Sequence, residues 1–258
     1  MIRWPLGNPA WAALDGPHAP LAERKGQVLR YPTDVSPFLA VPDHPDAGVW
    51  QDIADLAGPA STVAVVGGVD LPLPEGWAQV AETPAVQMEG TALPSEDPAV
   101  VGVTDQLGDT ALAGDRVALP ATSRFDALSE LVRLTDADVP EMLDLVARTR
   151  PGPFLARTVM LGNYLGIRHD GALVAMAGER LRPPGWTEIS AVCTDPAFRG
   201  HGLAGRLVQA VVAGIRSRGD EPFLHAAAVN TGAIRLYEQL GFRLNRTVRF
   251  TTYRTPDR

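Results

Sequence analysis

A short glycine-rich segment has the residue types and the spacing that phosphate binding requires. Residues 198–207 read FRGHGLAGRL, with glycines at positions 200, 202 and 205 and an arginine directly before the first of them. Glycine lets ligand oxygens approach the backbone closely, and arginine adds a charged hydrogen-bond donor. The backbone N–H groups at the start of a helix also attract phosphate, because they lie at the positive end of the helix dipole. The segment indicates either a phosphate-binding loop or an ordinary glycine-rich helix entry.

The same glycine spacing occurs in dinucleotide-binding loops, but the surrounding sequence differs from that motif. A dinucleotide loop directly follows an apolar strand, and an acidic residue at the end of the next strand holds the ribose. Here residues 195–199 separate the preceding strand from Gly200, and Asp220 and Glu221 precede the next strand instead of ending it. A nicotinamide-dependent oxidoreductase is therefore only a minor alternative.

Two segments resemble signatures of the GCN5-related N-acetyltransferases, the GNAT family. Residues 199–204, RGHGLA, fit the family's acyl-CoA motif Arg/Gln-x-x-Gly-x-Gly/Ala at every defined position. Residues 230–242, NTGAIRLYEQLGF, resemble the second signature, an asparagine after a strand and a helix that ends in Tyr-x-x-x-Gly-Phe. Two motifs in the correct order are far more specific than either alone. The resemblance covers roughly residues 131–253 and is closest to the FR47-like branch.

The resemblance implies an α+β fold with a mixed sheet, the GNAT acyl-CoA N-acyltransferase fold, and acetyl-CoA as the co-substrate. In that fold two strands diverge, the pantetheine arm pairs with the edge of one of them, and the pyrophosphate lies on the glycine loop. An unpaired strand edge suits the amide-rich arm for the same reason that it suits a peptide. The residues that we expect to contact the cofactor are Val192, Cys193, Thr194, Arg199, Gly200, His201, Gly202, Leu203, Ala204, Asn230 and Ala233.

Acyl transfer from a thioester to an amine needs a base for the amine and an acid for the departing thiolate. Tyr237 occupies the position of the family's tyrosine that protonates the sulfur; packing in the core is its structural alternative. Glu188 is the acid within the fourth strand of this region and is the candidate base, with burial expected to raise its pKa; a salt-bridged glutamate is the alternative. For Asn230, capping of the following helix is the alternative to cofactor binding.

Other reactive side chains carry weaker predictions. Cys193 is expected to be a buried, inert thiol, and His225 either faces the acceptor pocket or is buried for structural reasons. No cluster of His, Asp, Glu or Cys has metal-ligand spacing, and no serine or cysteine triad is evident, so we expect neither a metal nor a covalent intermediate. The loop at residues 150–154 is a candidate wall of the acceptor site.

Composition limits the partners of the chain. It has 258 residues, 45% of them hydrophobic, with a formal net charge of −7 and a single cysteine. An acidic balance argues against a nucleic-acid surface, and no segment approaches the roughly 20 apolar residues that span a bilayer. We expect a cytoplasmic monomer or homodimer whose acceptor is a small-molecule or peptide amine. A catalytically silent acyl-CoA sensor or scaffold is the alternative to an N-acetyltransferase.

Regular periodicity is clearest after about residue 125, where we predict a boundary between an N-terminal α+β domain (residues 1–124) and the GNAT domain (residues 125–258). The first domain is either a degenerate copy of the same fold or an extension that controls substrate access. Its predicted elements are strands at 27–31, 62–66 and 78–88 and a helix at 49–57. In the second domain we predict strands at 130–134, 163–168, 173–181, 187–194, 222–229 and 248–254, and helices at 135–148, 203–216 and 231–240, with a tight turn at 169–171.

Overall fold

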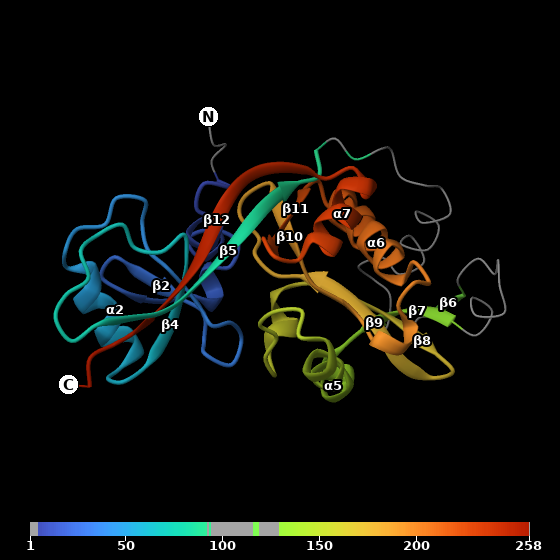
Figure 1. The fold of residues 1–258 in the computed structure, drawn as a ribbon, viewed down its shortest axis with the longest axis horizontal. Helices are drawn as coiled ribbons and strands as arrows, with labels where there is room; N and C mark the ends of the chain where they lie inside the picture. Colours follow the sequence, from blue (N-terminus) through green and yellow to red (C-terminus); the bar gives the residue numbers. More distant parts are fainter. Residues whose placement is uncertain (1–4, 92, 94–115, 119–128, 258) are drawn as a thin grey trace.

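The computed structural model describes residues 5–91, 93, 116–118 and 129–257. Its strands form one mixed 12-stranded sheet (Figure 1). In sheet order they are β1 (Glu23–Lys25), β2 (Val28–Arg30), β3 (Phe38–Ala40), β4 (Thr62–Val66), β12 (Arg243–Arg254), β5 (Ala78–Glu89), β11 (Glu221–Ala227), β10 (Trp186–Thr194), β9 (Ala172–Glu179), β8 (Tyr164–His169), β7 (Ser129–Leu134) and β6 (Arg116–Ala118). The α-helices are α1 (Pro9–Leu14), α2 (Val49–Ala57), α5 (Val139–Thr149), α6 (Leu203–Ser217) and α7 (Thr231–Leu240).

The antiparallel strands β7 to β10 begin the C-terminal half of the molecule. The predicted turn between β8 and β9 is confirmed: Asp170 and Gly171 have φ angles of 50° and 81°, and His169 pairs with Ala172. Positive φ at both central residues is the geometry of the two-residue turn that an Asp-Gly pair favours. The predicted helix start at residue 135 is also confirmed, because Thr135 and Asp138 form a capping box.

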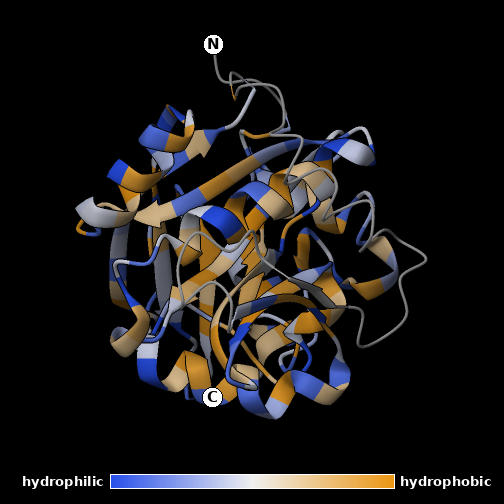
Figure 2. Ribbon diagram, turned by 90° about the vertical axis from the view of Figure 1, so that its right-hand side faces the viewer, coloured by the Kyte–Doolittle hydropathy of each residue, from blue (hydrophilic) through white to orange (hydrophobic). Residues whose placement is uncertain are grey.

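Helices cover both faces of this part of the sheet. Helix α6 packs on β8 to β11, and α5 packs on β9 and β10 from the opposite face. Successive strand residues pack on opposite faces of the sheet. Leu165 packs in the core cluster that contains α6, and its neighbour Tyr164 packs in the cluster that contains α5. Figure 2 shows hydrophobic residues concentrated along the strands and the inner helix faces, with hydrophilic residues at the periphery. The alternation follows from the two-residue period of a strand.

Strands β10 and β11 are parallel and diverge. Their paired residues run from Trp186 with Glu221 to Ile189 with Leu224, and the pairing ends there although β10 continues to Thr194. A bulge lies in β10 between Ser190 and Cys193, where Ala191 has a φ of 53°. A bulge bends and twists its strand, which turns the end of β10 away from β11. The predicted divergence of these two strands is therefore confirmed.

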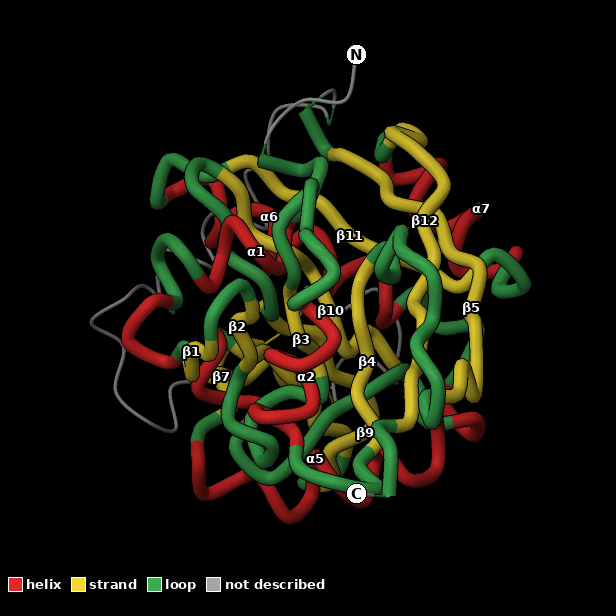
Figure 3. Tube along the Cα trace, turned by 90° about the vertical axis from the view of Figure 1, so that its left-hand side faces the viewer, coloured by secondary structure: helices red, strands yellow, loops and turns green. Residues whose placement is uncertain are grey.

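The two halves of the chain exchange strands. Strand β5 from the N-terminal half lies between β11 and β12, and the far end of β12 lies between β5 and β4. Figure 3 shows β4, β12 and β5 side by side. A core cluster also contains residues of both halves, among them Tyr31 and Phe38 with Trp186 and Phe223. The predicted boundary near residue 125 lies outside the described residues, and the sheet itself is continuous across the halves.

The N-terminal half repeats the local topology of the C-terminal half on a smaller scale. Strand β3, helix α2 and strand β4 form a parallel β-α-β unit, as do β10, α6 and β11. In both units an antiparallel neighbour precedes the first strand, namely β2 or β9. The segment between β4 and β5 contains no counterpart of α7. That the N-terminal half is a degenerate copy of the same fold stays a prediction.

Most predicted elements lie where the sequence indicates, and the differences are at their ends and in short pieces. Strand β12 begins at Arg243, five residues before the predicted start at Val248, because its first part pairs with the end of β5. The three-residue strands β1 and β3 and the six-residue helix α1 were not predicted, since elements this short carry little periodic signal.

Candidate active site

A groove of about 590 Å³ opens where β10 and β11 diverge. Its walls are the second half of β10, the loop before α6 with the first turn of that helix, the end of β11, α7, and the loop after α5. The groove therefore joins the two sequence motifs, which are separated along the chain by the length of α6 and β11. Ten of the eleven predicted cofactor residues line it: Val192, Cys193, Thr194, Arg199, Gly200, Gly202, Leu203, Ala204, Asn230 and Ala233.

His201 is the predicted residue that does not line the groove. Its two neighbours do, with φ angles of 85° at Gly200 and 71° at Gly202. These left-handed conformations alternate around His201 and direct its side chain to the exposed side of the loop. The His201 side chain thus does not line the groove, and contact of the cofactor with this position through its backbone N–H stays a prediction.

The loop before α6 presents an open helix N-terminus to the groove. A Cβ atom added at Gly200 or Gly202 would have no described heavy atom within 4 Å, and α6 has no side-chain N-cap hydrogen bond. Arg199 lies on the same loop and donates from Nε to the Thr194 carbonyl over 3.4 Å. Free helix N–H groups beside an arginine are the chemistry that a pyrophosphate needs.

The edge of β10 offers unpaired polar groups to the groove. Beyond Ile189 the strand pairs, among the described residues, only with β9, through Ser190 with Gly178, Cys193 with Met176 and Thr194 with Ala175. The buried Thr194 Oγ1 atom has no hydrogen-bond partner in the described part of the chain. An extended ligand rich in amides would satisfy such groups, so this wall fits a pantetheine arm.

The Cys193 thiol is buried, and burial raises its pKa. A thiol kept protonated in this way is a poor nucleophile, which agrees with the inert role expected for it.

Helix α7 places Asn230 and Tyr237 on the groove. The Asn230 side chain accepts from the Ala233 N–H over 3.2 Å, so it caps the helix, as its structural alternative predicts, and also lines the groove. Tyr237 is 6% exposed, and burial raises its pKa to about 12. Its hydroxyl makes no hydrogen bond to any other described residue. A protonated phenol without a protein partner is suited to donating its proton to a ligand.

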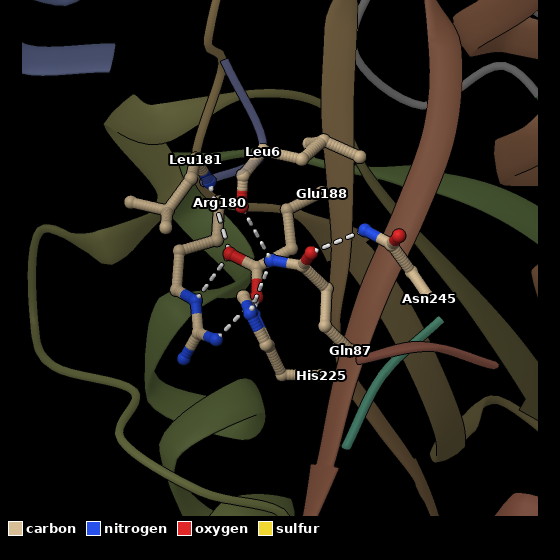
Figure 4. Close-up of polar contacts among 7 residues, drawn as sticks. All are labelled: Leu6, Gln87, Arg180, Leu181, Glu188, His225 and Asn245. Atoms are coloured by element: carbon tan, nitrogen blue, oxygen red, sulfur yellow. Dashed lines mark hydrogen bonds and ion pairs between the residues drawn. The ribbon is translucent and has the colours of Figure 1, made fainter. Parts of the chain in front are cut away.

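Glu188 lies at the centre of a buried polar network and does not line the groove (Figure 4). Its carboxylate accepts from Arg180 Nε over 2.9 Å and from Arg180 Nη2 over 2.6 Å, and from the Leu181 N–H over 3.3 Å. The Nδ1 atom of His225 lies 2.6 Å from Oε1 of Glu188. Both carboxylate oxygens are thus engaged, and the side chain is completely inaccessible to solvent.

The network corrects the expectation for the pKa of Glu188. Burial by itself would raise that pKa, but the charge of Arg180 and the contact with His225 outweigh it and lower the pKa to about 2. A carboxylate that is ionised down to such an acidic pH and has no free oxygen is a weak proton acceptor. The salt-bridged alternative describes Glu188 correctly.

The network also fixes the tautomer of His225. Gln87 Nε2 lies 3.1 Å from the Leu6 carbonyl, which can only accept, and 3.1 Å from Nε2 of His225. Gln87 Oε1 accepts from Asn245 Nδ2 over 2.7 Å. The amide therefore donates to Nε2 of His225, so the imidazole proton is on Nδ1 and is donated to Glu188. The His225 side chain is 2% exposed and also lines the groove, so it combines the buried position and the groove-facing position that were given as alternatives.

Strand register explains why these side chains meet. Gln87 pairs with His225 across β5 and β11, and Glu188 pairs with Phe223 across β11 and β10. The Arg180 N–H donates to the Glu188 carbonyl, which places Arg180, at the end of β9, beside Glu188 on β10. Four segments that are distant in the sequence thus contribute one side chain each. Arg180, Gln87 and Asn245 were not identified from the sequence, because no local motif surrounds them.

Two further expectations concern metals and membranes. Among the described residues, no group of three or more His, Cys, Asp or Glu side chains is arranged to hold a metal ion. No helix within the described ranges combines the length and the apolar character needed to cross a bilayer.

Comparison with known proteins gives two kinds of similarity over different lengths. The family model described as FR47-like protein matches residues 164–253, which contain the groove-forming strands and helices. A solved structure of a putative acetyltransferase from the GNAT family of Novosphingobium aromaticivorans is 35% identical. The alignment covers 97% of this chain and 98% of that one, with a TM-score of 0.77. The similarity therefore includes the N-terminal half as well as the groove.

Curated relatives are similar over shorter segments. The mycothiol acetyltransferase of Thermobispora bispora is 48% identical over 56 residues, which are 21% of this chain and 19% of that protein. The N-alpha-acetyltransferase RimI of Mycobacterium tuberculosis is 34% identical over 84 residues, 31% of this chain and 52% of that protein. The chain thus spans about a fifth and about half of the lengths of these two curated relatives.

Proposed function

The chain belongs to the GNAT family of acetyltransferases, and from this premise we propose that it transfers an acetyl group from acetyl-CoA to a primary amine. The observation that carries the proposal is the groove between the diverging ends of β10 and β11, which the open N-terminus of α6 borders. It combines an unpaired strand edge with free helix amides. Those are the two features that an amide-rich arm ending in a pyrophosphate requires.

In this proposal each part of acetyl-CoA has its own wall of the groove. Residues 199–204 would hold the pyrophosphate, and residues 192–194 would pair with the pantetheine arm. When bound, acetyl-CoA supplies a thioester whose carbonyl carbon accepts the amine. The chain would hold both reactants at the point where the two strands separate. Correct positioning of the reactants accounts for a large part of the rate acceleration in reactions of this kind.

The proton transfers divide between Tyr237 and solvent. The amine reacts in its uncharged form: its nitrogen forms a bond to the carbonyl carbon, the carbon–sulfur bond breaks, and the amine proton leaves to solvent. Tyr237, whose pKa is raised to about 12, donates its proton to the departing sulfur and regains one from solvent. Glu188 acts as a positioning residue, because its oxygens hold Arg180 and His225 and are not exposed to the groove.

The pH–rate profile tests this division of roles. A base that titrates in the groove would give an acidic limb that disappears on substitution. We expect Glu188→Gln to lower kcat through misplacement of Arg180 while leaving the shape of the profile of kcat/KM between pH 6 and pH 9 unchanged. Loss of an acidic limb in Glu188→Gln would show that Glu188 is the base and would contradict the positioning role.

A silent acyl-CoA sensor is the second candidate, and the engaged state of Glu188 favours it over an enzyme with a strong base. Acetyl-CoA binding measured by calorimetry, followed by thiol release over a panel of amines, separates the two. Turnover with any amine identifies an enzyme. Binding without turnover on the whole panel identifies the sensor and contradicts the proposed transfer.

Substitution at Gly202 tests the placement of the pyrophosphate. Gly202 and Gly219 both have positive φ, 71° and 81°, and a Cβ atom at either one meets no described atom within 4 Å. Alanine therefore introduces the same backbone strain at both ends of α6, but only Gly202 lines the groove. We expect Gly202→Ala to weaken acetyl-CoA binding by about tenfold or more and Gly219→Ala to leave it unchanged. Equal affinities for the two variants would contradict the assignment of this loop.

A further inference from the structure

The charges that line the groove have one sign. The lining contains Arg150, Arg180 and Arg199 and no aspartate or glutamate among the described residues. The chain as a whole has a formal net charge of −7, so the groove differs from the average surface. Arg199 lies on the loop before α6 and is accounted for by the proposed pyrophosphate. The other two arginines come from different segments, the end of β9 and the segment after α5.

Arg180 has an unused donor at the buried end of the groove. Two of its guanidinium nitrogens are bound to Glu188, and Nη1 makes no hydrogen bond to any described residue. In Figure 4 this third nitrogen points away from Glu188. The guanidinium carbon lies 4.9 Å from the centroid of the Phe38 ring, which holds the plane in place. The side chain is 9% exposed and lines the groove, so its remaining accessible surface opens onto the site.

A partly satisfied, nearly buried guanidinium favours a ligand with an anionic oxygen. Burial is costly for a polar group without a partner, and hydrogen bonds from arginine to carboxylate are among the strong ones. Glu188 and Phe38 fix the orientation of the Arg180 side chain before any ligand binds, so little conformational entropy is lost on binding.

Arg150 adds a second cation to the lining of the groove. It follows the last residue of α5 in a left-handed conformation, with a φ of 51°, which turns the chain toward the site. The residue is exposed, and it forms no ion pair with any other described residue. Pro151 and Gly152 after it also line the groove, so this segment is part of the wall.

We infer that the acceptor is a small primary amine that also carries a carboxylate, as a free amino acid does, with Arg180 and Arg150 binding the carboxylate. The inference rests on the proposed function, because it names the acceptor class of the same groove. An acceptor with several positive charges, such as a polyamine or a lysine-rich peptide, would meet two arginines and no acidic partner in the described wall. Like charges in such a site disfavour binding.

Matched acceptors test the inference. Thiol release from acetyl-CoA is measured with each of several amino acids, the corresponding amino-acid amide and the corresponding decarboxylated amine. We expect kcat/KM to be higher for the amino acids by about 100-fold, because a site built for a hydrogen-bonded group discriminates strongly against its absence. Equal or faster turnover of the decarboxylated amines, or of a lysine-rich peptide, would overturn the inference while leaving the proposed transfer intact.

Two arginine variants separate recognition from folding. Arg150→Gln changes an exposed side chain, so the variant should fold, and we expect its KM for amino acids to rise about tenfold with kcat and the KM for amides unchanged. Arg157→Gln is the matched control, since Arg157 lies on the same segment, is exposed and does not line the groove. Arg180→Lys keeps the charge beside Glu188 and loses Nη1, and we expect it to reduce the preference for a carboxylate. An unchanged preference in both groove variants would overturn the inference.

The two proposals fail in different ways. Absence of acetyl-CoA binding by calorimetry would contradict the proposed function and the inference with it. Binding and turnover without a preference for a carboxylate would contradict the inference alone.

Discussion

The two halves of the molecule contain the same β-α-β unit, but the N-termini of the helices in the two units differ. At α6 the chain presents Gly200 and Gly202 with open space around them and Arg199 beside them. At α2 the corresponding place is filled by Asp46, whose side chain accepts from the Gly48 N–H over 2.8 Å and whose carbonyl accepts from the Val49 N–H over 3.0 Å. A carboxylate of the chain itself thus lies beside the N-cap residue of α2, although α2, like α6, has no side-chain hydrogen bond to its first-turn amides.

The comparison shows that a repeated fold does not repeat a site. Both helices have an N-terminus with free amides by geometry alone. The two N-termini differ in the residues that precede them: glycines and an arginine before α6, and an aspartate before α2. The N-terminal half instead contributes structure to the site in the other half, through Gln87 on β5 and the Leu6 carbonyl.

The largest expected effect concerns the tyrosines of the two halves. Tyr237 lines the groove, whereas Tyr31 lies in the core of the N-terminal half with its hydroxyl 2.9 Å from Nδ1 of His18. We expect Tyr237→Phe to lower kcat by about 10²- to 10⁴-fold and to leave acetyl-CoA affinity unchanged, because only proton donation is lost. Tyr31→Phe should leave kcat within about twofold of the natural protein. Steady-state kinetics and calorimetry measure both, and a normal kcat in Tyr237→Phe would remove its role as the acid.

The next effect concerns buried and exposed ion pairs. Arg180 and Glu188 have side-chain exposures of 9% and 0%, and in the N-terminal half Arg24 and Asp15 are each 53% exposed. Arg180→Met leaves a buried carboxylate without its partner, so we expect the free energy of unfolding to fall by about 3–5 kcal/mol. Arg24→Met should cost about 1 kcal/mol or less. Denaturant unfolding of the two variants checks the contrast, which similar losses would contradict.

A smaller effect is the pH dependence of the free energy of unfolding, to which His18 and Glu188 contribute in different pH ranges. Burial, with the nearby charge of Arg182, lowers the pKa of His18 to about 4. The folded state therefore resists protonation of His18 while the unfolded state accepts it, so stability is lost as the pH falls from the ordinary value of 6.5 to about 4, by about 3 kcal/mol. The pKa of Glu188 is lowered to about 2, so its contribution is present above about pH 4.5 and is lost only below that.

Unfolding free energies measured between pH 2 and pH 7 test which residue causes the loss of stability in each pH range. His18→Gln should flatten the slope between pH 6.5 and pH 4, and Glu188→Gln should reduce the slope below pH 4.5, where Asp138 and Asp195, whose pKa values are also lowered, still contribute. An unchanged slope in His18→Gln would show that other groups govern the upper window.

The smallest effect concerns Asp46, before the N-terminus of α2. Asp46→Ala removes the side-chain acceptor of the Gly48 N–H and of Gln27 Nε2, and loss of such hydrogen bonds costs about 1 kcal/mol of stability. We expect the variant still to bind one acetyl-CoA per chain, because the segment before α2 has no equivalent of Arg199. Calorimetric stoichiometry measures this, and a second equivalent of acetyl-CoA would show that Asp46 alone had blocked a second site.

The local parts of the site were predictable from the sequence. Residues 199–204 and 230–242 carry helix-start and helix-end signals together with most of the residues that line the groove, so the motifs and the geometry coincide. Helix α7 and strand β4 lie where periodicity and turn residues indicate. These features depend on residues that are close in the sequence, and the hydrophobic period of a helix or strand is a pattern over such residues.

The role of Glu188 was not predictable in the same way. Its residue type and its place on a strand are equally compatible with a raised pKa in an apolar pocket and with a lowered pKa beside a cation. Arg180 lies eight residues away across a strand connection, His225 comes from β11, and Gln87 comes from the other half of the chain. Only the register of four strands decides that they meet.

The amino-acid sequence by itself determined the family signatures, the glycine-rich start of α6 and the place of Tyr237 on α7, because each rests on short-range spacing. Tertiary structure alone decided that β5 and β12 exchange between the halves, that Glu188 is held by an arginine, and that Arg180 keeps one donor for the groove. The physical reason is that strand pairing joins residues of any separation, so the electrostatic environment of a buried side chain is set by register.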